Sequence, residues 1–372
     1  MHEPAMTLSH AVQSTVPPTS IIALGTALPP RLVSQQELLT WGLERVGMKP
    51  ETRDLYRRVL ADDGIATRHF AVDDLTELLQ TDHDVILARF ERWAAELSAT
   101  SLTRALETAH QEARAIDFLA ATTCTGYLCP GLTSYIMERA GLRSDVRRVD
   151  IVGMGCVAAL PALEQACQFL AAHPDGTAAV VSTEICTAAI LFGDAPDLVV
   201  SNAIFGDGSA AAVLRSADRA ADAPATSPRP CFLGFRSLTL PEWRESLRFR
   251  TEGGHLRNVL SRDVPVRAGA ACRRLVLELL GEHEVRSERV AHWVMHAGGR
   301  LILDAVERAL DLPATALEAA RAVLRDVGNL SSPTVLFVLD EEQRRRPPRA
   351  GELGVVSSFG AGFSAHAALV TY

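Results

Sequence analysis

The sequence has little of what nucleic-acid-binding, exported or membrane proteins need. The formal net charge is −8, so there is no basic excess for a polyanion, and the first twenty residues lack the apolar core of a signal peptide. No later run is apolar for long enough to span a bilayer. Aromatic residues make up only 5% of the chain, whereas 48% is hydrophobic and 22% charged, the balance of a globular protein. We therefore expect a cytoplasmic protein without a nucleic-acid or membrane partner.

The cysteines indicate reduced thiols. Seven is an odd number, and a chain without an export signal is not expected to build a disulfide framework. Cys124 and Cys129 stand five residues apart, but no matching second pair exists and no histidine lies at ligand spacing from either. No metal is therefore expected.

The order of predicted elements indicates an α/β protein. A length of 372 residues exceeds what one ordinary core supports, so we expect two domains or one large duplicated domain. Strands alternate with helices, which is typical of a mostly parallel sheet covered on both faces. The predicted strands are residues 20–24, 118–122, 148–152, 291–295 and 334–339. The predicted helices are residues 84–108, 157–172, 300–310 and 314–325, with one more ending near residue 140.

Two halves of the chain repeat one pattern. A glycine turn enters an Ala/Val-rich strand at Phe205-Gly-Asp-Gly208 and again, 154 residues later, at Phe359-Gly-Ala-Gly362. Residues 221–230 are rich in Pro, Ala and Ser and are the best candidate for a linker. We expect an N-terminal arm over residues 1–19, one half over 20–222 and a second over 231–372. Ligands of such units usually bind in the crevice between them.

Cys156 stands where a nucleophile is expected. It follows a predicted strand and a tight Gly153-Met-Gly155 turn, and it precedes a predicted helix. A thiol at a helix N-terminus meets unpaired N–H groups and the positive end of the helix dipole, which favour the thiolate. Because a cysteine between Gly and Val is more often a buried core residue, this position needs support from other residues.

His296 and Asn329 supply that support from turns in the second half. His296 ends a predicted strand and precedes Gly298 and Gly299, whereas Asn329 lies between a predicted helix and a predicted strand. Alone, a His is commonly a core or surface residue, and an Asn in a turn commonly bonds the backbone. Together with Cys156 they suit acyl transfer, because a thiolate paired with imidazolium attacks a thioester. Their donors could also stabilise the enolate left when a malonyl group loses carbon dioxide.

These segments resemble type III polyketide synthases, the chalcone-synthase-like branch of the thiolase superfamily, over about residues 20–372. The resemblance is carried by Ile21-Ile-Ala-Leu-Gly-Thr-Ala-Leu-Pro-Pro30, Val152-Gly-Met-Gly-Cys156, Phe205-Gly-Asp-Gly208, His296-Ala-Gly-Gly-Arg300, Gly328-Asn-Leu-Ser-Ser332 and Phe359-Gly-Ala-Gly362. It implies a thiolase-like five-layered αβαβα fold built from two duplicated halves, working as a homodimer. It also implies a decarboxylating Claisen condensation of an acyl-CoA starter with malonyl-CoA, without a further cofactor. The family's catalytic residues fall on Cys156, His296 and Asn329.

The same resemblance assigns a substrate pocket and a CoA site. Phe205 matches a gatekeeping phenylalanine between the CoA tunnel and the cavity, whereas Asn258 falls where a second such phenylalanine is usual. The other cavity-lining positions fall on Cys124, Thr125, Cys186, Ala189 and Ser331. Basic residues that hold CoA phosphates in relatives fall near Arg57, Arg58 and Arg68.

The resemblance leaves the product open. Asp150-Ile-Val-Gly-Met-Gly-Cys156 and Glu184-Ile-Cys-Thr-Ala-Ala189 look closest to dihydroxyphenylacetyl-CoA synthase. Thr123-Cys-Thr-Gly-Tyr127 looks more like alkylpyrone, alkylresorcinol and tetrahydroxynaphthalene synthases. The starter, the number of extensions and the ring closure therefore stay undetermined. The alternatives are a single-condensation enzyme like β-ketoacyl synthase III and a non-catalytic partner subunit. A papain-like hydrolase is disfavoured because that family's cysteine signature is absent.

Overall fold

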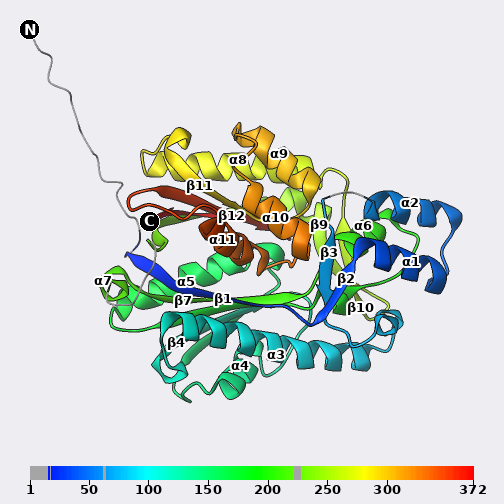
Figure 1. Ribbon diagram of the computed structural model, residues 1–372, viewed down its shortest axis with the longest axis horizontal. Helices are drawn as coiled ribbons and strands as arrows, with labels where there is room; N and C mark the ends of the chain where they lie inside the picture. The colour runs from blue at the N-terminus through cyan, green and yellow to red at the C-terminus, as the bar shows by residue number, and fades with distance from the viewer. Residues whose placement is uncertain (1–15, 17, 62–63, 222–227) are drawn as a thin grey trace, which may run out of the picture.

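The computed structural model describes residues 16, 18–61, 64–221 and 228–372 (Figure 1). Most of the expected N-terminal arm, and residues 222–227 of the expected linker, lie outside the described residues. The fold begins with β1 (Thr19–Ala27), which contains the strand predicted over residues 20–24.

A nine-stranded sheet runs through the described part of the chain in the order β11-β12-β13-β8-β1-β7-β6-β4-β5. At its middle, β1 and β8 pair only through Thr19 with Phe232 and Ser20 with Cys231. The sheet is thus two sets of strands, one from each half of the chain. The first set comprises β1, β4 (Phe118–Thr123), β5 (Arg147–Val152), β6 (Ala178–Glu184) and β7 (Gly208–Ser216). The second comprises β8 (Cys231–Thr239), β11 (Val290–Met295), β12 (Leu353–Gly360) and β13 (Ser364–Thr371).

Helices separate and cover the two sets of strands (Figure 1). The helices α3 (His83–Ala109) and α4 (Leu132–Ala140) pack on the outer face of the first set. The helices α8 (Val264–Glu282) and α9 (Arg300–Leu310) form the outer layer of the second set. Between the sets lie α5 (Ala159–Ala172) and α11 (Thr334–Arg345), each of which contacts strands of both. This order of layers is αβαβα, so the expected thiolase-like fold is confirmed.

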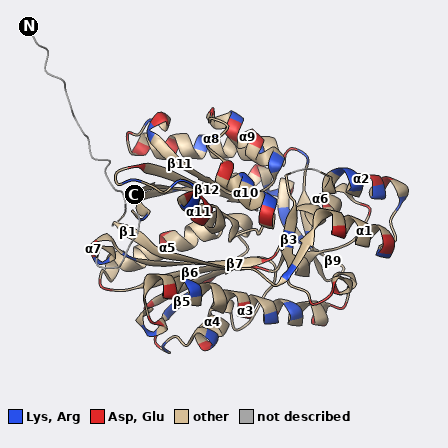
Figure 2. Ribbon diagram, viewed as in Figure 1, with Lys and Arg blue, Asp and Glu red and all other residues tan. Residues whose placement is uncertain are grey.

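The apolar patterns explain the layers. The buried face of α3 carries Ile86, Phe90, Trp93 and Leu97, at the three- and four-residue spacing of an amphipathic helix. Residues Gly155–Ala172 are apolar enough to cross a membrane by composition, but α5 lies between two sheets and is a core helix. Charged side chains are concentrated on the outer helices, as Figure 2 shows.

A smaller region packs beside the layers and forms one end of the molecule (Figure 1). It contains the strand pair β2 (Arg31–Ser34) and β3 (Thr67–Phe70), the hairpin β9 (Leu247–Glu252) and β10 (His255–Leu260), and the helices α1 (Gln35–Arg45), α2 (Pro50–Leu60) and α6 (Pro196–Ile204). The remaining helices are α7 (Ala217–Ala220) and α10 (Glu318–Val327).

The strand predicted over residues 334–339 is wrong, because these residues begin the helix α11. All six are buried, since α11 is enclosed between α10 and the two sets of strands. A helix that is buried on every side has no amphipathic stripe. Its continuous apolar run therefore predicts a strand when the sequence alone is considered. The helix predicted over residues 314–325 begins four residues later, at Glu318.

Candidate active site

Cys156 lies in a 3-10 turn, Gly155–Val157, that connects β5 to the central helix α5. The turn needs glycine, because Gly153 and Gly155 have φ angles of 80° and 61°, in the left-handed region. The end of β12 packs against it so closely that a Cβ on Gly360 would stand 2.9 Å from the backbone nitrogen of Cys156. The two halves of the chain therefore meet at the cysteine.

Asn329 occupies the matching place in the second half, in the turn before the other central helix, α11. Its Nδ2 donates to the carbonyl oxygen of Gly298 at 3.2 Å, and its Oδ1 accepts from the backbone N–H of Ser331 at 2.8 Å. Ser331 has a φ of 61°, which is uncommon for a residue with a side chain and typical of strained functional turns. Asn329 is therefore held between the Gly298 loop and the Ser331 turn.

His296 follows the end of β11 and is buried. Its backbone N–H donates to Ser357, and its ring meets the edge of Phe359 with the centroids 5.2 Å apart. Neither ring nitrogen has a hydrogen-bond partner among the described residues. Burial lowers the pKa of His296 to about 3, so the imidazole is neutral near pH 7.

Ser331 connects the three turns. The thiol of Cys156 donates to Oγ of Ser331 at 3.4 Å, and Sγ of Cys124 lies 3.5 Å from the same oxygen. Because Asn329 bonds both Ser331 and Gly298, contacts run without a break from Cys156 to the loop that follows His296. The structure thus brings the three predicted turns together, although no direct hydrogen bond joins Cys156 to His296.

The expected low pKa of Cys156 is not found. Burial raises its pKa to about 12, and the nearby carboxyl of Glu184 acts in the same direction, against the hydrogen bond to Ser331. The expectation rested on a helix N-terminus, but α5 begins only at Ala159, after the 3-10 turn. The thiol and the imidazole are therefore both neutral near pH 7.

Glu184 is not among the site residues predicted from the sequence. Its carboxylate binds both the Cys124–Thr125 segment and the Ser331–Ser332 segment. It is fully buried at the end of β6 and accepts from the backbone N–H groups of Cys124 and Thr125, at 2.9 and 3.1 Å. The hydroxyls of Thr125 and Ser332 donate to it at 2.8 Å, and that of Ser331 at 3.4 Å. Burial raises its pKa. The signal in the sequence is a carboxylate that ends a strand of small and uncharged residues, 178–183.

A pocket of about 540 Å³, including the part open to solvent, lies next to the thiol of Cys156. All seven predicted pocket residues line it: Cys124, Thr125, Cys186, Ala189, Phe205, Asn258 and Ser331. His296 and Asn329 are not among its lining residues. A second pocket, lined mainly by apolar side chains of α1 and α2, shares Ile190 and Asn202 with the first.

The three predicted CoA-binding arginines differ in their surroundings. Arg57 and Arg58 are exposed near the end of α2, where Arg57 pairs with Asp54 at 2.6 Å. Arg68 is fully buried and donates to the carbonyl oxygens of Asn202 and Phe205, both at 2.7 Å. Its assignment to CoA phosphates is therefore corrected: no phosphate can reach it, and it instead holds the chain next to the pocket wall.

The fold and this site define an acyltransferase of the thiolase type, and comparison with known proteins gives the family. A family model described as FAE1/type III polyketide synthase-like protein matches residues 30–226, and one described as chalcone and stilbene synthases, C-terminal domain, matches residues 239–371. The chain belongs to the type III polyketide synthases, which carry out decarboxylating Claisen condensations.

Named relatives and a solved structure agree. The chain is 32% identical to 3,5-dihydroxyphenylacetyl-CoA synthase of Streptomyces toyocaensis, over 96% of this chain and 91% of that protein. It is also 32% identical to 1,3,6,8-tetrahydroxynaphthalene synthase of Streptomyces peucetius subsp. caesius, over 95% and 93%. The crystal structure of 1,3,6,8-tetrahydroxynaphthalene synthase from Streptomyces coelicolor superposes with a TM-score of 0.86 at 25% identity, covering 95% of this chain and 99% of that one.

Proposed function

We propose that Cys156 carries the acyl chain, while His296 and Asn329 serve both loading and decarboxylation. The observation that supports this most directly is the continuous set of contacts from the Cys156 thiol through Ser331 and Asn329 to the Gly298 loop. These residues come from two halves of the chain, and a purely structural role does not explain why a buried imidazole in this loop has no partner among the described residues.

Loading begins with transfer of the Cys156 proton to His296. The imidazole offers a site for this proton because neither of its ring nitrogens has a hydrogen-bond partner among the described residues. The sulfur then attacks the carbonyl carbon of the starter thioester, the bond to the CoA sulfur breaks, and the CoA leaves as a thiol after taking the proton from His296, which returns to its neutral form.

Extension uses the same donors on a second thioester. When malonyl-CoA loses carbon dioxide, the electrons of the broken C–C bond form an enolate, whose oxygen needs preplaced donors. Asn329 gives one of its two amide hydrogens to Gly298, which leaves the other for this oxygen. The enolate carbon attacks the acyl group on Cys156, and the Cys156 sulfur departs, so that the extended chain remains on CoA. In a further cycle, the extended chain is transferred from CoA back to Cys156.

The product is proposed to be a cyclised polyketide of the alkylpyrone, alkylresorcinol or dihydroxyphenylacetyl type. Two relatives are named for hydroxylated aromatic products, which supports ring closure. The test is incubation of the protein with malonyl-CoA and a panel of acyl-CoA starters, followed by mass analysis. Several extensions and a ring are expected. One extension without a ring would point to a β-ketoacyl synthase III-like enzyme, and no extension with any starter would point to a non-catalytic subunit.

CoA thioesters are the proposed substrates, and no further cofactor is proposed. Arg57 and Arg58 are the proposed contacts for CoA phosphates, because both are exposed on α2. Replacement of Arg58 by Ala should raise the KM for malonyl-CoA with little change in kcat, since a phosphate contact of this kind contributes equally to binding of the ground state and the transition state. An unchanged KM would remove Arg58 from the CoA site.

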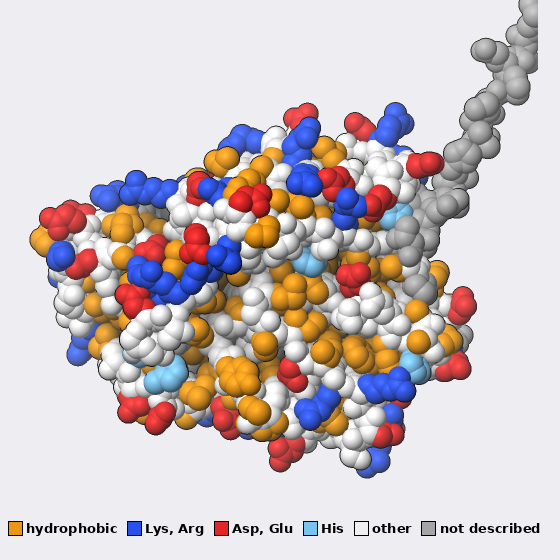
Figure 3. Space-filling model, turned by 180° about the vertical axis from the view of Figure 1, so that it is seen from behind, with side chains coloured by type: hydrophobic (Ala, Val, Ile, Leu, Met, Phe, Trp, Pro, Cys, Tyr) orange, Lys and Arg blue, Asp and Glu red, His pale blue; other side chains and the backbone are white. Residues whose placement is uncertain are grey.

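A cytoplasmic homodimer is the proposed state. Hydrophobic side chains are gathered across the face shown in Figure 3. Among the large apolar residues, Tyr127 is 71% exposed and Val152 is 53% exposed, and each follows or precedes a turn that carries a cysteine of the site. Burying such side chains in a subunit interface would stabilise it. Light scattering after gel filtration should give twice the chain mass, and Val152→Asp should lower it.

A further inference from the structure

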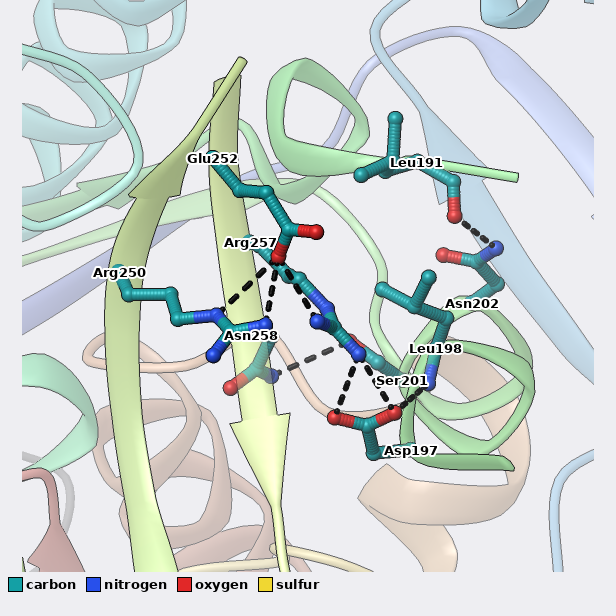
Figure 4. Close-up of polar contacts among 9 residues, drawn as sticks. All are labelled: Leu191, Asp197, Leu198, Ser201, Asn202, Arg250, Glu252, Arg257 and Asn258. Atoms are coloured by element: carbon teal, nitrogen blue, oxygen red, sulfur yellow. Dashed lines mark hydrogen bonds and ion pairs between the residues drawn. The ribbon is translucent and has the colours of Figure 1, made fainter. Parts of the chain in front are cut away.

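The part of the pocket wall where the β9–β10 hairpin meets α6 carries a buried polar pair. Asn258 on β10 is 5% exposed and Ser201 on α6 is 8% exposed, and both line the pocket. Nδ2 of Asn258 donates to Oγ of Ser201 at 3.1 Å (Figure 4). Their neighbours in the lining are Leu247, Arg248 and Phe249 of β9 and Asn202 of α6, so apolar and polar side chains both surround the pair.

The pair has two unused hydrogen-bonding positions. Because Oγ of Ser201 accepts from Asn258, its own hydroxyl hydrogen is free to donate, and it has no acceptor among the described residues. The carbonyl oxygen Oδ1 of Asn258 likewise has no donor in the described part of the chain. Both residues line the pocket, so a donor and an acceptor without a protein partner stand side by side where a polar group of a ligand can bind them.

Ion pairs hold the pair in position. Arg257, next to Asn258, donates to both carboxylate oxygens of Asp197 at 3.2 and 3.3 Å, and Asp197 begins the helix that carries Ser201. Arg257 and Arg250 also both donate to Glu252 in the same hairpin (Figure 4). The hairpin is thus fixed to α6, and a ligand would meet the donor and the acceptor already arranged.

We infer that Asn258 and Ser201 recognise an enol hydroxyl on the polyketide chain and so determine which acyl chains the enzyme keeps. This inference rests on the proposed function. An enol oxygen accepts from the Ser201 hydroxyl while its hydrogen donates to Oδ1 of Asn258, which satisfies both positions. A saturated alkyl chain of the same length satisfies neither and leaves two buried polar groups without partners.

The test compares thioester starters that differ only in enolisable oxygens. The pairs are acetoacetyl-CoA with butyryl-CoA and 3,5-dioxohexanoyl-CoA with hexanoyl-CoA, each supplied with malonyl-CoA. In the wild type, kcat/KM for the oxygenated member of at least one pair should exceed that of the saturated member by about tenfold, the size expected for a buried hydrogen bond. Asn258→Leu should abolish this preference, and the smaller change Ser201→Ala should reduce it.

A control variant and the choice of readout separate a loss of enol recognition from a general change of the pocket. Phe249→Leu changes an apolar residue paired with Asn258 across the hairpin, so the preference should survive it. The preference is read as the ratio of kcat/KM within each starter pair, so a general loss of activity in any of the three variants affects both members of a pair and cancels in the ratio. A wild type without preference, or an unchanged preference in Asn258→Leu, overturns the inference while leaving the proposed function intact. Absence of both decarboxylation and extension in the wild type contradicts the proposed function itself.

Discussion

The thiol of Cys156 donates to Oγ of Ser331 at 3.4 Å, across 175 residues of sequence and between the two halves of the fold. Ser331 in turn donates to the buried carboxylate of Glu184. At rest, the thiol is therefore hydrogen-bonded as a neutral donor, and its activation requires a base.

We predict that His296 is this base. In His296→Ala, alkylation of Cys156 by iodoacetamide at pH 7 should fall by about tenfold or more, because the thiolate is the reactive form and a buried thiol with a raised pKa supplies little of it without a base. The rate should then rise steadily toward high pH. Peptide mass mapping would follow Cys156 separately from the exposed Cys129. Equal rates in the variant and the wild type would exclude His296 as the base.

Asn329→Ala should slow carbon dioxide release from malonyl-CoA by about a hundredfold, the usual cost of losing one donor to a developing oxyanion. Loading of a radiolabelled starter on Cys156 should remain measurable. Cys156→Ala should show the reverse pattern, since it removes the acceptor of the acyl group and retains the donors. If Asn329→Ala releases carbon dioxide at the wild-type rate, Asn329 has no part in decarboxylation.

Arg68→Ala should destabilise the fold, by about 3 kcal/mol or more, because it leaves two buried carbonyl oxygens without donors and removes a fully buried side chain. Urea unfolding would measure this change. Arg58→Ala is the matched control, since Arg58 is exposed and its loss should change stability by less than about 0.5 kcal/mol. An Arg68 variant of normal stability would contradict the structural role.

The buried imidazole of His292 should make stability depend on pH. Although burial favours the neutral ring, hydrogen bonds at 3.0 Å to Glu342 and to Glu352 raise its pKa above 6.5, and Arg346 and Tyr372 are the other ionisable groups facing this cluster. A raised folded-state pKa contributes stability that is complete below about pH 6.5 and is lost as pH rises through the folded value.

The Tm measured between pH 6 and pH 9 would test whether stability falls as pH rises. The wild type should lose stability over part of this range, and His292→Gln should lose less. His83→Gln is the control, because His83 is exposed at the start of α3. A wild-type decline that persists unchanged in His292→Gln would assign it to another group.

Ala189→Phe should shorten the longest starter that the enzyme accepts. Ala189 lines the catalytic pocket beside Ile190, which also borders the second, apolar pocket. Each methylene that can no longer be buried costs roughly 0.8 kcal/mol of binding, or about fourfold in kcat/KM. Competition among acyl-CoA starters of increasing length would measure the change, with decarboxylation of malonyl-CoA unaffected. An identical chain-length profile would show that the starter does not pass Ala189.

The sequence by itself determined the fold class, several of the strands and helices, and the turns that carry Cys156, His296 and Asn329. These followed from local pattern and from motif strings, which depend on neighbouring residues. It also named seven residues that line one pocket beside Cys156, because the resemblance transfers positions one by one.

Only the tertiary structure decided what depends on burial and on long-range contacts. The apolar run at residue 334 became a helix because sheets and α10 enclose it, and Arg68 became a buried support because its partners lie more than 130 residues away. The pKa of Cys156 rose because desolvation outweighs the favourable position that the local sequence indicates. The pairing of Asn258 with Ser201 likewise exists only because the hairpin folds onto α6. A local pattern cannot report how much water remains around a group or which distant residues it contacts, and these two properties set the outcomes.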